Sequence, residues 1–86
     1  MEKLIGEVVV VDTSTELLYM GRLSAVSEHW VEIAGVDIVD LGEVKIPREL
    51  ILIEKKRDGL KPSRGSVMLS ARCVVSVSVL SQILDP

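Results

Sequence analysis

The chain has 86 residues, of which 48% are hydrophobic, only 2% are aromatic and none is phenylalanine, and its formal net charge at pH 7 is −3. A chain of this length has room for one hydrophobic core, so we expect a single domain over residues 1–86 and no large two-lobed enzyme cleft. The 14 valines and 7 isoleucines favour β-structure over a bundle of helices, because β-branched side chains suit a pleated surface.

The single cysteine, Cys73, and the single histidine, His29, exclude several classes of site. One cysteine cannot form a disulfide within the chain, and one histidine cannot supply the ligand set of a zinc finger. The acids Asp37, Asp40 and Glu43 lack the spacing of a calcium loop, and no serine lies in a G-x-S-x-G motif. We therefore predict that the chain is not an enzyme and needs no metal or other cofactor.

No part of the sequence indicates a membrane protein. Residues 1–6 lack the apolar run of a signal peptide, and no stretch approaches the roughly 20 apolar residues that span a bilayer. We expect a soluble, cytoplasmic protein without membrane contact.

The first half of the sequence predicts strands joined by short turns. Leu4 to Asp12 is a short, valine-rich run that ends in turn residues, which favours a strand over a helix. Leu18 to Val26 alternates between two faces, and Gly21 in its middle suggests a sharp bend or the close approach of another backbone.

A third alternating segment, His29 to Ile33, follows after a short turn. Gly35 interrupts the pattern, but Val36 to Leu41 can continue the same strand past a bulge or bend at Ala34-Gly35. Successive strands with only short turns between them predict a meander.

Residues 47–58 are open to two interpretations. Pro47 at the start, three bases near the end and Gly59 just beyond favour a helix. Three apolar residues would share one face of that helix: Ile46, Leu50 and Ile53. The run of four apolar residues at 50–53 also fits a buried strand, which remains the alternative.

The remaining sequence predicts a terminal hairpin. Val67 to Ser70 and Cys73 to Leu80 have the composition of strands and would be joined at Ala71-Arg72. In the second strand the valines occupy one face and the serines the other: Val75, Val77 and Val79 against Ser76 and Ser78. Residues 81–86 predict a short tail.

Tyr19, Gly21, Leu23 and Val26 have the spacing of the first motif of the Sm-like superfamily, and the chain resembles that family. It also looks like uncharacterised bacterial Sm-like proteins with an inserted helix. The resemblance implies a mainly β, Sm-like (SH3-type) five-stranded small barrel with one short helix inserted before the final hairpin. It further implies a homo-oligomeric ring, in which the free strand edges of neighbouring subunits pair.

The charges are distributed unevenly, which raises the possibility of RNA binding. Residues 1–54 hold eleven acids and four bases, whereas residues 55–86 hold six bases and two acids. The candidate RNA-binding residues are Lys55, Lys56, Arg57, Lys61 and Arg64, with His29 and Trp30 as groups that could stack on a base. The same bases fit a solvated helix end, His29 fits a surface position, and Trp30 fits a core or a subunit interface.

The resemblance also decides the order of the functional hypotheses. Sm-type RNA binders place an Asp directly after the motif and an Asn shortly afterwards, but this chain has Ser27 and no Asn at all. The second motif's Arg-Gly appears as Arg64-Gly65, before the predicted last hairpin rather than within it. We therefore expect an oligomer-forming scaffold or interaction module, and keep RNA binding through residues 55–64 as the alternative.

Overall fold

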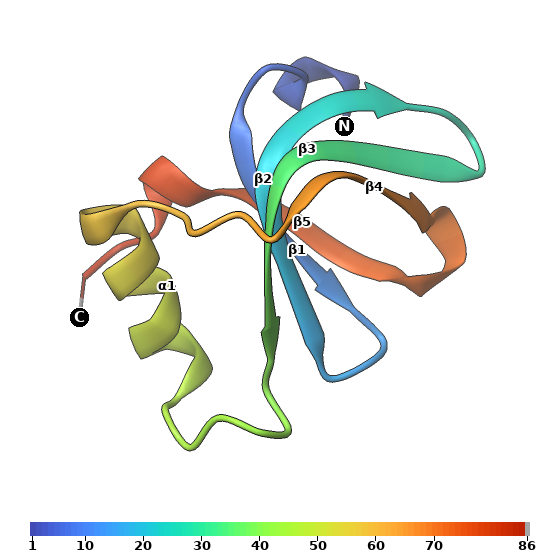
Figure 1. The fold of residues 1–86 in the computed structure, drawn as a ribbon. Coiled ribbons are helices and arrows are strands. Elements are labelled where there is room, and N and C mark those ends of the chain that lie inside the picture. The colour runs from blue at the N-terminus through green and yellow to red at the C-terminus, as the bar shows by residue number, and fades with distance from the viewer. Residues whose placement is uncertain (86) are drawn as a thin grey trace.

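Over residues 1–85, which the computed structural model describes, the protein folds as a five-stranded antiparallel sheet with one α-helix (Figure 1). The strands lie in the order β4-β3-β2-β1-β5. The elements in chain order are η1 (Glu2–Leu4), β1 (Val8–Thr13), β2 (Leu17–Val26), β3 (Trp30–Asp40), α1 (Arg48–Asp58), β4 (Arg64–Ser70), η2 (Ala71–Cys73), β5 (Val74–Val79) and η3 (Leu80–Gln82), where η marks a 3-10 helix. The predicted mainly β architecture and the meander of the first three strands are confirmed.

The predicted terminal hairpin is wrong, because β4 and β5 lie at opposite edges of the sheet and do not pair. The short helix η2 carries the chain from one edge to the other. At its start the Ala71 N–H donates to the carbonyl of His29 at 2.8 Å, and at its end the Cys73 carbonyl accepts from the Ser14 N–H at 2.8 Å. The short helix η2 is therefore bonded to the residue before β3 at one end and to the residue after β1 at the other. The sheet is strongly bent, but over residues 1–85 it does not close.

The sheet is buried on both faces, which explains the unbroken run of valines in β1. The inner face holds one cluster of buried side chains: Val9, Val11, Leu23, Val31, Ile33, Val36 and Leu69. The outer face holds a second cluster, to which α1 and η3 contribute: Val10, Leu18, Met20, Leu52 and Leu80. Successive residues of β1 therefore enter different cores.

A bulge between β2 and β3 confirms the prediction made from Gly21 and Gly35. The register changes from Met20↔Asp37 to Arg22↔Ala34, so β3 has one more residue than β2 at this point. Gly35 adopts a positive φ of 61°. The backbones approach so closely that a Cβ on Gly21 would lie 2.8 Å from the Ala34 carbonyl oxygen.

The two interpretations of residues 47–58 are decided in favour of a helix: α1 spans Arg48–Asp58, Pro47 precedes it, and Gly59 ends it with a φ of 91°. The predicted apolar face is wrong: the buried side chains are Ile51 and Leu52, whereas Leu50 is 47% exposed. The direction of α1 is fixed by contacts with β1 and β3, described below, rather than by the spacing of its own apolar residues. No helix within residues 1–85 is both long and apolar enough to cross a membrane.

The two ends of the chain also differ from the prediction. Residues Glu2–Leu4 form η1 rather than the start of a strand, and β1 begins only at Val8. The expected tail begins inside η3, and Ile83 packs against the outer core beside buried Leu80. At the other end, Leu4 of η1 packs against the inner core, so apolar side chains hold both ends against the sheet.

Replacing Gly21 by alanine tests the close approach of β2 and β3. Because the added Cβ would overlap backbone atoms that cannot rotate away, we expect Gly21→Ala to lower the free energy of unfolding by about 1–3 kcal/mol. Gly65→Ala in β4 is the matched control, since its Cβ would meet no atom within 4 Å, and it should change stability by less than about 0.5 kcal/mol. Urea unfolding measures both, and equal stabilities of the two variants would contradict the contact.

Candidate functional site

The basic segment, residues 55–64, covers the C-terminal turn of α1 and the loop that leads into β4. Lys55 Nζ lies 2.7 Å from Asp37 Oδ2, and the two side chains are only 19% and 7% exposed. The same carboxylate accepts a hydrogen bond of 2.9 Å from the Lys61 backbone N–H. Lys55 therefore holds α1 against β3, and its charge is largely neutralised by Asp37.

Two further bases of this segment also have partners. Lys56 Nζ donates to the Ile83 carbonyl oxygen at 2.6 Å, which joins α1 to the C-terminal residues. Arg57 Nε donates to Asp58 Oδ1 at 2.9 Å. This hydrogen bond raises the pKa of Arg57 and lowers the pKa of Asp58. The side chains of Lys61 and Arg64 are exposed.

His29 and Trp30 lie away from the basic segment. His29 belongs to the turn between β2 and β3, which Figure 1 shows on the opposite side of the molecule from α1. Its side chain is exposed, and its backbone N–H donates to Ser27 Oγ at 3.3 Å. Trp30 opens β3, is 49% exposed and pairs with Ser70 of β4. The structure therefore does not gather all seven predicted residues on one surface.

The edges of the sheet expose apolar side chains. Each edge strand, β4 and β5, pairs with one other strand within residues 1–85. Met68 of β4 is 56% exposed and Val75 of β5 is 69% exposed. A register shift between Asp12 and Thr13 leaves Val75 without a partner on β1. The predicted valine face of β5 thus reaches the core only with Val77 and Val79.

An ion pair that the sequence did not reveal fixes the start of α1. Arg48 makes a two-pronged contact with Asp12 of β1, with Nε 2.8 Å from Oδ1 and the second bond between Nη2 and Oδ2. The hydrogen bond to Asp12 raises the pKa of Arg48. Asp12 also accepts from Ser76 Oγ of β5 at 2.9 Å, so one carboxylate joins β1, β5 and α1.

The other polar residues considered for a function, Cys73, Asp37 and Asp40, make contacts within the fold. Cys73 is partly buried, packs against the inner core, and donates from Sγ to the Ser70 carbonyl oxygen at 3.1 Å. Of the three acids considered for calcium, Asp37 is committed to Lys55 and Asp40 Oδ1 accepts from the Gly42 N–H at 2.9 Å. Within residues 1–85 no group of three His, Cys, Asp or Glu side chains is arranged to hold a metal ion.

Comparison with known proteins leaves the structure itself as the basis for classification. No family model matches the sequence, and no curated protein matches it. The fold defines a small mainly β domain with one bent antiparallel sheet, a helix on its outer face and two edge strands.

The different surroundings of Lys55 and Lys56 give a direct test of their roles. Lys55→Met would leave the buried Asp37 carboxylate without its cation, so we expect it to lower the free energy of unfolding by about 2–3 kcal/mol. Lys56→Met is the control on the same helix, and it loses one exposed hydrogen bond worth less than about 1 kcal/mol. Chemical unfolding measures both values. A larger loss for Lys56→Met would contradict the structural role of Lys55.

Proposed function

We propose that this chain is an Sm-like protein with an open, bent five-stranded sheet, which acts as an oligomer-forming scaffold or interaction module with no catalytic step of its own. The spacing of Tyr19, Gly21, Leu23 and Val26 supports the family assignment, together with the tight bulge that Gly21 makes possible. The observation that carries the scaffold function is the pair of free edges on one bent sheet.

The two edges are suited to pairing with each other. Arg64 is the one charge in the two edge strands and lies at the first position of β4. From Gly65 to Val79 the chain has a single charged residue, Arg72, and that residue lies in η2 between the two strands. An edge strand without charges, prolines or a cover is an open site for another strand. Because β4 and β5 are different surfaces, β4 of one copy would pair with β5 of the next, a head-to-tail contact that closes into a ring when the rotation permits.

The exposed side chains beside the edges favour the same contact. Met68, Val75 and Trp30 are each about half exposed or more, and all three lie on or beside an edge strand. Burying such apolar area would stabilise an assembly by about 25 cal/mol for each Å² removed from water. A small domain has little interior in which to hide them, which favours burial between copies.

Self-association tests the proposal directly. We expect light scattering at micromolar concentration to give a mass several times the 9.4 kDa of the monomer. The double variant Met68→Lys, Val75→Lys should give the monomer mass, since it places a charge on each edge at an exposed position. Leu50→Lys makes the same change at an exposed position of α1 and should leave the oligomer intact.

The indole of Trp30 supplies a second measurement, because it is the one tryptophan of the chain. Its fluorescence should shift to the blue as concentration rises through the assembly range, and should stay constant in the double variant. A monomeric mass for the unmodified chain at all concentrations up to about 0.1 mM would contradict the proposal.

RNA binding through the basic segment is the alternative function, and the ion pairs of Lys55 and Arg57 argue against it. A phosphate would have to displace Asp37 from one and Asp58 from the other. We expect no micromolar affinity for a pool of single-stranded RNA at about 0.15 M salt. Tight binding that weakens steeply with salt, and is lost in Lys61→Glu, Arg64→Glu, would instead favour RNA as the ligand.

A further inference from the structure

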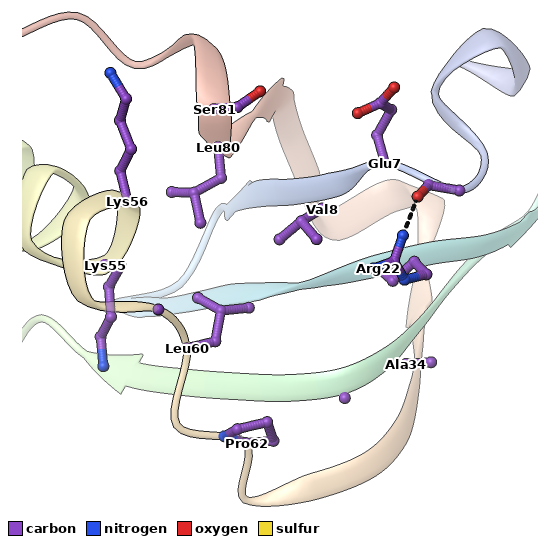
Figure 2. Close-up of a pocket in the computed structure, with 13 residues that line it drawn as sticks. Glu7, Val8, Arg22, Ala34, Lys55, Lys56, Leu60, Pro62, Leu80 and Ser81 are labelled. Atoms are coloured by element: carbon purple, nitrogen blue, oxygen red, sulfur yellow. Dashed lines mark hydrogen bonds between the residues drawn. The ribbon is translucent and has the colours of Figure 1, made fainter.

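A pocket of about 720 Å³ opens on the outer face of the sheet, beside the end of α1 (Figure 2). Its size lies within the range of about 300–1,000 Å³ that is typical of small-molecule sites. Figure 2 shows the apolar side chains of Val8, Leu60 and Leu80 directed into it from β1, the loop after α1 and η3.

The pocket exists because the outer face is covered over only part of its area. The side chains of Leu52 and Leu80 complete the outer core over the neighbouring part of the sheet. Beyond them the floor is formed by Ala34 and Gly35, whose small or absent side chains leave the surface hollow. The apolar walls therefore continue the outer core but have no protein layer above them.

The polar groups of the pocket are mainly cationic. Arg22, on β2, donates from Nη1 to the Gly6 carbonyl oxygen, and Lys56 donates to the Ile83 carbonyl oxygen. Both acceptors are neutral, and neither cation has a salt-bridge partner within residues 1–85. Lys55 also lines the pocket, but Asp37 compensates its charge.

One acid, Glu7, lies in the same lining. Figure 2 shows its carboxylate directed away from Arg22, on the other side of β1 in that view. The guanidinium of Arg22 uses one of its five N–H groups on Gly6, which fixes its position and leaves other donors for a ligand. A carboxylate or a phosphate matches that fork of donors.

We propose that this pocket binds a small amphipathic anion, with its apolar body against Val8, Leu60 and Leu80 and its anionic group at Arg22. Lys56 at the other end of the pocket adds to the positive potential. No lining residue belongs to β4 or β5, so the pocket stays separate from the edges through which the proposed assembly forms. The site thus stands whether or not the chain forms a ring.

The glycines of the chain allow a precise binding experiment. Gly6, Gly35 and Gly59 line the pocket, whereas Gly42 and Gly65 do not. The amide signals of ¹⁵N-labelled protein would be followed by NMR during titration with octanoate, octyl phosphate and octanol, all below micelle-forming concentrations. We expect saturable shifts confined to the three lining glycines for at least one of the two anions, and at least about tenfold weaker binding of the alcohol.

Variants separate the electrostatic contribution from folding. Arg22→Gln should lower the affinity for the anion about tenfold and leave the affinity for octanol unchanged. Arg57→Gln is the control, because Arg57 is an exposed arginine of α1 that lies outside the pocket, and this variant should bind as the unmodified chain does. Glu7→Gln should strengthen anion binding. Ala34→Leu fills the floor and should abolish binding while the melting temperature is maintained.

The titration results identify the chemical class of the anion. Binding of octanoate alone identifies a carboxylate ligand, binding of octyl phosphate alone identifies a phosphate ester, and binding of both identifies the shared charge as sufficient. Absence of shifts at millimolar ligand would overturn the proposal. Equal shifts at the three lining glycines and at Gly42 and Gly65, equal affinity for octanol, or unchanged affinity in Arg22→Gln would overturn it as well.

Discussion

The extra residue that β3 carries opposite Gly21 determines which side of the sheet every later residue of that strand faces. Up to Ile33 the odd-numbered residues point into the inner core, but after the bulge at Gly35 the even-numbered Val36 takes that position. The next residue, Asp37, is thereby turned to the outer face, where it meets Lys55 and the backbone of the loop after α1. The outer layer of the protein depends on this change of parity.

Features that are determined by a few neighbouring residues could be predicted from the sequence. Gly21 and Gly35 indicated a close approach and a bulge, and Pro47 with Gly59 indicated the limits of α1. The orientation of α1 could not be predicted, since it depends on contacts made across 36 residues by Arg48 and Asp12. The predicted hairpin failed for a related reason: composition identifies two strands, but it does not show that each pairs with a different neighbour.

The candidate sites also differ in whether they depend on neighbouring residues or on contacts between distant ones. The basic segment was visible as a run of charges, but the partner that neutralises Lys55 lies in another strand and is invisible to any local pattern. The sequence pattern did not identify Arg22 as a candidate binding residue, because an isolated base in an alternating strand usually faces water. Its position in a pocket follows from Ala34 and Gly35 lying beside it on β3, and that neighbourhood exists only after the bulge has formed.

The pairing of β1 with β5 sets the order in which the molecule can assemble. Asp12 and Ser76 touch although 64 residues separate them, so this ladder closes the longest loop in the sheet and carries a large entropic cost. A ribosome adding about 5–20 residues per second needs roughly 3–13 seconds to make that intervening chain. Throughout this interval β1 has β2 on one side and a bare, valine-rich edge on the other. The nascent protein is therefore most exposed to misassociation just before β5 is released.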